Sequence, residues 1–373
     1  MKRTLRISSG LAVIMASASL TACAADSLPT SIAPPTRLSS SANANGNSYD
    51  LPIYGLGGFR RATPQSPCAN GNYRQFDFWL GTWKVYNIAG VFVATSRILN
   101  TLDGCVIEEN WAPLNGLRGR SLSSYDAESG VWRQTWVPEN SSSGARPIRL
   151  AGGLRADGVM DMSGVRTNSF FGFNYFDHFQ WTPVDANHVI QSVTLDIPAF
   201  NLHFASAPRY ERTSDPLPAT TSPGTVNCLT GDAAETRNLD FTVGNWSLTA
   251  ANGLSIGSSS IVVDPTLSGC LVAESFSTPK GYRAIGWLYY DALENTYFRT
   301  YVDTEGERVE MRGTFDNGTL VLEGAEPIHG ANGARVRMTW TQTSPTKLLQ
   351  LWEASRDGGE TWREVQAITF TRQ

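Results

Sequence analysis

The chain has few histidines, no excess of basic residues and no second hydrophobic run long enough to span a membrane. The four histidines are not spaced like metal ligands, and no Cys-x-x-Cys pair is present. The sequence also lacks a Gly-x-Ser-x-Gly elbow and a glycine-rich phosphate loop between a strand and a helix. These absences argue against a metal site, a serine hydrolase and a nucleotide-binding domain.

The charge balance argues against a nucleic-acid partner. The sequence has 30 Lys and Arg against 34 Asp and Glu, a net charge of −4. Loss of an N-terminal segment with Lys2, Arg3 and Arg6 leaves 27 basic residues against the same 34 acids, a net charge of −7. We therefore expect no binding to nucleic acid, which needs a basic surface.

The N-terminus reads as a bacterial export signal. The three basic residues precede an apolar stretch, residues 11–20, that is too short to cross a bilayer as a helix. The stretch ends in Leu20-Thr21-Ala22-Cys23, which matches the lipobox of lipoproteins, where the cysteine is lipidated and becomes the new N-terminus. A plain secretory peptide with a chance cysteine is the alternative. We expect a signal peptide over residues 1–22 and attachment to a membrane through lipid on Cys23.

The residues after Cys23 predict a location and a tether. Ala24 and Ala25 resemble the residues of lipoproteins that are sent on to the outer membrane, so we expect a protein of the cell envelope that faces the periplasm. Residues 23–67 are rich in Ser, Ala, Asn and Pro, a composition typical of a flexible tether. A protein partner in the envelope is an open alternative.

The strongest signal in the sequence is an internal duplication. Residues 74–83 return as residues 237–246, and residues 102–105 return as residues 267–270. Later matches include Tyr125-Asp126 with Tyr290-Asp291 and Trp181-Thr182 with Trp340-Thr341. The repeat predicts two domains, residues 68–212 and 228–373, joined by a Ser- and Pro-rich linker over residues 213–227.

The duplication also selects a cysteine pairing. Besides Cys23 there are four cysteines, which allow three pairings. Each copy has one cysteine before its Asp-Phe motif and one in its Gly-Cys motif, which predicts Cys68–Cys105 and Cys228–Cys270. An exported chain meets an oxidising compartment, where each bridge would contribute on the order of 4 kcal/mol. Four free thiols or a metal site are the alternatives.

Hydrophobic residues alternate with a period of two, which predicts strands. Residues 131–137, 296–302 and 335–341 show the alternation, and turn signals such as Asn252-Gly253 separate such runs. Helical patterns are absent, apart from a short turn expected around residues 74–80. Many short antiparallel strands in about 145 residues indicate a sandwich or a barrel, and an up-and-down order favours the barrel.

Four motifs in the first copy resemble those of a known family. They are Phe-Asp-Phe-Trp-Leu-Gly-x-Trp at residues 76–83, Leu-Asp-Gly-Cys-Val-Ile-Glu-Glu at 102–109, Gly-Arg-Ser-Leu-x-x-Tyr-Asp at 119–126 and Trp-Arg-Gln-x-Trp-Val at 132–137. They are similar to exported bacterial domains of unknown function that belong with the lipocalin- and nitrobindin-like β-barrels. The resemblance covers residues 68–373, with a looser second copy. It implies an all-β chain of two tandem antiparallel lipocalin-like barrels and no particular activity.

Polar residues stand between aromatic residues at alternate positions, which is the clearest sign of a ligand site. Gln134 lies between Trp132 and Trp136, and the matching positions hold Arg299 between Tyr297 and Tyr301. Each triple shares one strand face. If that face points inward, it places a hydrogen-bonding group in an aromatic-walled cavity. The alternative is that the polar groups satisfy one another in a filled barrel.

Two carboxylates and two amides extend this set. Glu109 stands beside Trp111, Glu274 stands beside Phe276, and Gln191 matches Gln350. An ion pair between Arg299 and Glu274 would make the second copy purely structural, and the change from Gln134 to Arg299 argues against identical ligands. The candidate ligand-binding residues are Glu109, Trp111, Trp132, Gln134, Trp136, Gln191, Glu274, Tyr297, Arg299 and Tyr301.

Three further features have less weight. His203 lies on an expected late strand, where nitrobindins place a haem ligand, but we expect no cofactor and no metal. Ser355-Arg356-Asp357-Gly358-Gly359-Glu360-Thr361-Trp362 resembles an Asp-box hairpin, for which we expect a turn with Trp362 in the core. The aromatic stretch over residues 170–179 predicts either a lid or docking surface, or packing under the barrel.

Together these features predict a lipid-anchored envelope protein that binds a small apolar or amphipathic ligand inside a barrel, without catalysis. A hydrolase or isomerase that uses Glu109 or Glu274 as general acid and base is one alternative. No second carboxylate is evident to complete a glycosidase pair. A structural or assembly lipoprotein is the other alternative.

Overall fold

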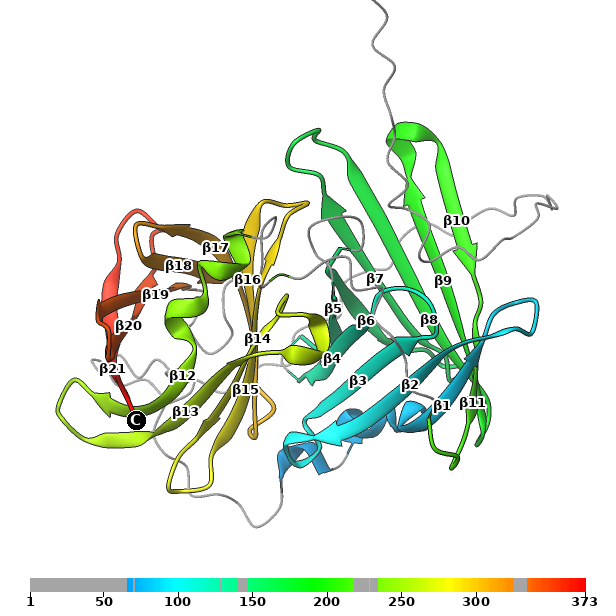
Figure 1. The fold of residues 1–373 in the computed structure, drawn as a ribbon, viewed down its shortest axis with the longest axis horizontal. Helices are drawn as coiled ribbons and strands as arrows, with labels where there is room; N and C mark the ends of the chain where they lie inside the picture. The colour runs from blue at the N-terminus through cyan, green and yellow to red at the C-terminus, as the bar shows by residue number, and fades with distance from the viewer. Residues whose placement is uncertain are drawn as a thin grey trace, which may run out of the picture.

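The computed structural model describes residues 66–69, 71–127, 129–139, 146–217, 228, 234–324 and 334–373. The expected signal peptide, Cys23 and nearly all of the expected tether lie outside these residues, as does most of the expected linker. The described part forms two closed antiparallel barrels of ten strands each, which stand side by side (Figure 1). The prediction of an all-β chain with two tandem barrels is confirmed, and ten-stranded barrels fit the lipocalin-like kind.

The first barrel is a meander with a ring of ten strands and an eleventh strand paired to one of them. Its strands are β1 (Gly81–Tyr86), β2 (Phe92–Thr101), β3 (Val106–Pro113), β4 (Gly119–Asp126), β5 (Val131–Pro138), β6 (Ile148–Leu154), β7 (Met160–Thr167), β8 (Asn174–Asp185), β9 (His188–Ile197), β10 (Leu202–Ser206) and β11 (Arg209–Arg212). Each strand from β1 to β9 pairs with the next, and β11 pairs with both β9 and β1 and so completes the ring of ten. Strand β10 is the eleventh strand and pairs with the other half of β9. Pro208, which has no N–H to donate, separates β10 from β11.

The second barrel repeats this order without the interruption. Its strands are β12 (Gly244–Ala250), β13 (Ser255–Val263), β14 (Val272–Ser277), β15 (Arg283–Asp291), β16 (Thr296–Asp303), β17 (Arg308–Asp316), β18 (Thr319–Gly324), β19 (Arg335–Ser344), β20 (Lys347–Ser355) and β21 (Arg363–Arg372). The single strand β21 takes the place of β10 and β11 and pairs with β20 and β12.

Short helices occur at the barrel ends and turns. They are η1 (Pro67–Ala69), η2 (Gly71–Arg74), η3 (Asp77–Trp79), η4 (Leu102–Gly104), η5 (Pro198–Phe200), α1 (Ala234–Arg237), η6 (Asp240–Thr242) and η7 (Pro265–Leu267). The expected turn near residues 74–80 corresponds to η2 and η3. Among the described residues, no helix is both long enough and apolar enough to cross a membrane.

The duplicated aromatic motif closes one end of each barrel. In the first barrel the η3 segment places Phe76 against Trp79 and Trp181, with ring centroids 4.9 and 5.2 Å apart. The indole of Trp83 donates to the carbonyl of Trp79 at 2.9 Å, and Trp246 donates in the same way to Thr242 at 2.9 Å. These rings are buried. The motif therefore forms the apolar end of each barrel core, which we call the aromatic floor.

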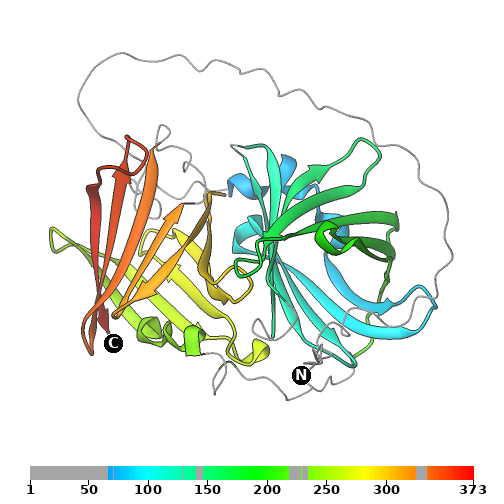
Figure 2. The same cartoon turned by 90° about the horizontal axis from the view of Figure 1, so that it is seen from above.

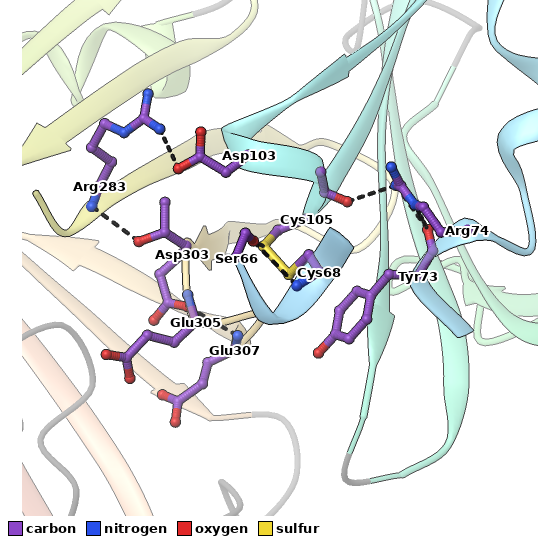
Figure 3. Close-up of a disulfide and its surroundings, with 12 residues drawn as sticks. Ser66, Cys68, Tyr73, Arg74, Asp103, Cys105, Arg283, Asp303, Glu305 and Glu307 are labelled. Atoms are coloured by element: carbon purple, nitrogen blue, oxygen red, sulfur yellow. Dashed lines mark hydrogen bonds and ion pairs between the residues drawn. A yellow bond between two sulfur atoms is a disulfide. The ribbon is translucent and has the colours of Figure 1, made fainter. Parts of the chain in front are cut away.

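Both predicted disulfides are present. Cys68 joins Cys105 with 4.9 Å between the Cα atoms, and Cys228 joins Cys270 with 5.0 Å. The first bridge lies beside the turn of the second barrel that carries Asp303 (Figure 3). Asp103, near this bridge, forms an ion pair with Arg283 of the second barrel. The bridge therefore fastens the segment before the floor to β3 at a point where the two barrels meet.

The barrels contact each other through the outer faces of their strands, as both views show (Figures 1 and 2). A buried apolar cluster joins outward side chains of β3–β5 to those of β15 and β16; it includes Val106, Leu122, Val137, Trp287, Tyr289, Phe298 and Val302. Polar bonds surround the cluster. Arg308 donates to Ser124 at 3.0 Å and to Thr135 at 2.9 Å, and its side chain is only 1% exposed. The two barrels thus share a packed interface.

Candidate functional site

The predicted aromatic and polar triples lie where the alternation placed them. Trp132 and Gln134 on β5 are buried, and Trp132 and Trp136 pack against the core of the first barrel. The Gln134 amide donates to Ser123 at 2.9 Å and, more weakly, to Ser121 at 3.5 Å. The triple on β16 faces the core of the second barrel in the same way. The inward orientation that a ligand site requires is therefore present in both copies.

Glu109 is an acid surrounded by uncharged donors. It is 5% exposed, and it accepts hydrogen bonds from Ser96 at 2.8 Å and from Ser121 at 3.3 Å. Register places these groups on neighbouring strands, since Glu109 on β3 pairs with Ser121 on β4 and Ser96 lies on β2. Burial raises the pKa of Glu109 to about 7, and its hydrogen bonds oppose this rise only in part.

A tyrosine links Glu109 to the predicted amide Gln191. The Tyr210 hydroxyl donates to Gln191 Oε1 at 3.1 Å, and it also bonds to Glu109. The Tyr210 hydroxyl has one proton, so it donates to Gln191 or to Glu109 at any one time, and donation to Glu109 favours the carboxylate. This hydrogen bond opposes the rise in the pKa of Glu109 that burial causes. Below pH 7 the acid is largely protonated, and the network then presents an uncharged hydrogen-bonding surface.

The second barrel neutralises its acid with a cation. Arg299 donates to Glu274 at 2.6 Å, and the two side chains are 3% and 8% exposed. Ser259, which matches Ser96, also donates to Glu274 at 3.0 Å. The predicted ion pair is thus present. Phe370 takes the position of Tyr210 in the second barrel. Tyr210 lies two residues before Arg212, which is paired in register with Trp83 of β1. Phe370 lies two residues before Arg372, which is paired in the same way with Trp246 of β12.

The interiors of the two barrels differ in solvent access at matched positions. In the first barrel Trp111, Trp136, Phe179, Gln191 and Val193 are only partly buried. In the second, all five matching residues are buried: Phe276, Tyr301, Met338, Gln350 and Trp352. These positions lie on the side of Gln134 and Glu109 away from the aromatic floor. Solvent therefore reaches more of the interior of the first barrel at that end, which we call its open end, than of the second barrel, whose matched side chains are buried.

Large side chains fill the second barrel at this end. Trp352 is 6% exposed and donates to Gln350 Oε1 at 2.8 Å, and Val193 stands at its position in the first barrel. Tyr282 packs on Phe276 with 5.7 Å between ring centroids and donates to Asp303 at 2.8 Å. Tyr297, a predicted site residue, is bonded near the floor, where it donates to the carbonyl of Glu235 at 2.8 Å.

Sequence reasoning missed Ser96, Ser121, Ser123 and Tyr210, which complete the network of the first barrel. One signal was present for Tyr210. The duplication aligns it with Phe370, and the two residues differ only by the hydroxyl that reaches Glu109 and Gln191. The serines gave no such signal, because serine is common on both faces of exposed strands.

Two weaker candidates are placed away from the interior. His203 pairs with Asp196 across β9 and β10, with its ring 2.5 Å from the carboxylate and 60% exposed. Val193 and Leu195 face inward, so Asp196 and His203 point outward. The Asp-box segment forms the expected turn, in which Asp357 accepts from Thr361 N at 2.9 Å. Trp362 was expected in the core, but it stacks half-buried on Arg337 at 4.3 Å because Arg337 lies on the outer face.

Within the described ranges, no three His, Cys, Asp or Glu side chains form a group that could hold a metal ion. No family profile matches the chain, and no curated protein matches it. Among solved structures, it is similar to a protein of unknown function of the DUF3598 family from Nostoc punctiforme, at 11% identity and a TM-score of 0.19, over 82% of this chain and 100% of the other. That similarity supports no conclusion about function, and the fold rests on the strand pairing above.

Proposed function

We propose that this chain is a lipid-anchored protein of the cell envelope whose first barrel binds a small apolar or amphipathic ligand without catalysis. The second barrel is its structural partner. The observation that carries the proposal is the difference in access between the barrels at five matched interior positions. An accessible interior lined by Trp111, Trp136 and Phe179 is the form of a ligand site, since such sites combine apolar walls with a few fixed polar groups.

The polar groups indicate what kind of ligand fits. Gln134, Ser121, Tyr210 and Glu109 carry no cation among them, and the acid is largely protonated below pH 7. An anionic ligand group would be left without a counterion in an apolar interior, which is costly, and a cationic group would require Glu109 to lose its proton. A hydroxyl, carbonyl or amide would be hydrogen-bonded. The ligand class is therefore an uncharged molecule with an apolar body and one polar end.

The duplication supplies a matched pair of variants to test binding. Val193→Trp places in the first barrel the side chain that fills the second, and we expect it to abolish binding of the neutral fluorescent probe N-phenyl-1-naphthylamine. Trp352→Val removes that side chain from the second barrel. It should cost about 3 kcal/mol of stability and leave the probe affinity of the first barrel unchanged. Unchanged probe binding in a folded Val193→Trp protein would contradict the proposal.

One observation favours the enzyme alternative. A buried carboxyl with a pKa of about 7 has the acidity that a general acid or base needs at neutral pH. If Glu109 were catalytic, molecules that co-purify with the protein would be converted by the wild type and retained by Glu109→Gln. Native mass spectrometry of both proteins distinguishes this outcome. Simple binding gives the same bound mass in the two proteins.

The envelope location rests on the sequence at Cys23 and the residues behind it. Cys23 lies outside the described residues, so its lipidation is tested by the mass of the intact protein from a bacterial host. The expected mature chain begins at Cys23 and carries acyl groups. A chain that keeps residues 1–22, or that lacks acyl groups, would remove this part of the proposal.

A further inference from the structure

Phenylalanine side chains gather at the open end of the first barrel. Two hairpin tips meet there: residues 168–173, between β7 and β8, and the η5 turn, between β9 and β10. Phe170, Phe171 and Phe200 are 85%, 71% and 59% exposed. The ring of Phe173 bridges the tips, with its centroid 4.9 Å from Phe200 and 6.2 Å from Phe171. We call these four residues the phenyl tip.

The phenyl tip marks the end opposite the aromatic floor. Along β8, Trp181 contacts the floor residue Phe76, then Phe179 follows at the accessible level, and the strand begins at the phenyl tip. Both hairpins end on the same side of the barrel, away from the short helices of the floor (Figure 1). The accessible interior and the phenyl tip therefore share one end of the barrel.

The amide N–H groups of the longer tip are already hydrogen-bonded. Each amide N–H from residue 168 to residue 172 donates to an acceptor within the protein. Asn168 Oδ1 accepts from Phe170 at 3.0 Å and from Phe171 at 2.9 Å, while Ser169 N donates to the carbonyl of Leu293 in the second barrel at 2.9 Å. A segment whose N–H groups are all bonded can enter an apolar medium without the cost of unpaired donors. The bond to Leu293 also fixes the tip between the barrels.

The chemistry of the two tips fits lipid. Residues 168–174 and 198–202 contain no Lys, Arg, Asp or Glu. Charged residues begin below them, with the exposed pair of Asp196 and His203. Exposed phenyl groups above a polar band are the pattern of elements that insert shallowly into the headgroup and acyl boundary of a bilayer. A partner that adds a strand would instead need free backbone groups at the tip.

A bilayer is also the surface that the chain's own anchor would supply. This step rests on the proposed lipidation of Cys23. The 42 residues between Cys23 and Ser66 could reach at most about 150 Å when fully extended. Such a connection keeps the barrels near the membrane but does not determine which face of the barrels turns toward it. The orientation of the barrels must therefore be determined by the folded part of the chain.

We infer that the phenyl tip inserts into the lipid surface to which the chain is anchored, and so turns the open end of the first barrel toward the membrane. The apolar ligand then passes between the bilayer and the barrel with little exposure to water. This names the source of the ligand, which the proposed binding function leaves open. The second barrel, which is filled, has no such exchange.

The test places an environment-sensitive label at the phenyl tip of the full chain. Phe171→Cys carrying a nitrobenzoxadiazole group is reconstituted in vesicles of phosphatidylethanolamine and phosphatidylglycerol that contain doxyl-labelled lipid. Leu254→Cys is the control, because Leu254 is 64% exposed at a hairpin tip of the second barrel. We expect at least threefold more quenching at position 171. Because the tips carry no charge, the quenching should not fall when salt is raised.

Equal quenching at the two positions, weak or strong, would overturn the inference. A label at Phe200→Cys gives a second measurement on the other hairpin. The mass of the protein reports acylation of Cys23, and a chain without lipid is tested with added vesicles in the same way. Binding of the fluorescent probe is measured in parallel. The Val193→Trp variant should lose probe binding and keep the quenching. The double variant Phe170→Ser, Phe171→Ser should keep probe binding and lose the quenching of a label at position 200. A failure of ligand binding is thereby distinguished from a failure of insertion.

Discussion

Inside the second barrel, Arg299 donates a 2.6 Å hydrogen bond to the carboxylate of Glu274, and both residues are buried. The corresponding residues of the first barrel, Gln134 and Glu109, are linked through Ser121. A buried charge is tolerated when it is paired and is costly when it is not. One scaffold therefore holds an internal ion pair in one copy and an uncompensated acid in the other, and the two copies should respond differently to pH and to substitution.

The acid of the first barrel should make the protein less stable as pH rises. Burial raises the pKa of Glu109 from 4.5 to about 7 in the folded state. Between these values the unfolded chain releases a proton that the folded chain keeps, so the free energy of unfolding falls as pH rises through this window. The fall is about 1.4 kcal/mol per pH unit, roughly 3 kcal/mol in all. Below pH 4.5 the group contributes no pH dependence.

Glu109→Gln removes this titration and keeps the shape of the side chain. In urea unfolding at pH 4.5 and pH 8, the difference in stability between the variant and the wild type should shift by roughly 3 kcal/mol in favour of the variant at the higher pH. Equal pH dependence in the two proteins would show that Glu109 is ionised in the folded state at neutral pH.

Substitution of the acid in the second barrel, Glu274, should destabilise the protein. Glu274→Gln leaves Arg299 buried without its counterion, which should cost about 3 to 5 kcal/mol at pH 7. Adding Arg299→Gln to that variant removes the stranded charge and should recover a large part of the loss. A thermal unfolding series of the single and double variants measures the coupling. Additive losses would contradict a direct pair.

Only some features of the fold and of the site were predictable from the sequence. The disulfides and the inward triples were predicted because they depend on local motifs and on a period of two, which the duplication reports twice. Tyr210 was not predicted, since it reaches Glu109 only when β11 closes the ring, about 100 residues away along the chain. The open end was not predicted either. It depends on the combined volume of side chains from several strands, of which Val193 against Trp352 is one part.

Tyr210 should tune the titration of Glu109. Its hydrogen bond lowers the pKa of Glu109 and so opposes the effect of burial. Tyr210→Phe removes this bond, so the pKa of Glu109 should rise further above its ordinary value. The loss of the bond to Gln191 should also cost about 1 to 3 kcal/mol.

The measurement is an NMR titration of the carboxyl carbon of Glu109 in protein labelled with ¹³C glutamate. The matched control is Phe370→Tyr, which introduces the hydroxyl at the same position of the filled barrel. It should destabilise the protein by about 1 to 3 kcal/mol through overpacking and leave the Glu109 titration unchanged. If the pKa of Glu109 is the same in Tyr210→Phe as in the wild type, the Tyr210 hydroxyl does not bond to Glu109.

Arg308 should couple the two barrels. Its side chain extends from the outer wall of the second barrel, is 1% exposed, and donates to Ser124 and Thr135 of the first. Arg308→Ala removes these bonds and leaves Glu310 without its close cation, so we expect a loss of about 3 to 5 kcal/mol. Because each barrel has its own apolar core, the weakened interface should also separate one calorimetric transition into two.

Arg312→Ala is the control on the same strand, since Arg312 is 56% exposed and lies 3.7 Å from Glu294. It should change stability by no more than about 0.5 kcal/mol. If both variants lower the transition temperature equally, the contacts of Arg308 do not join the barrels.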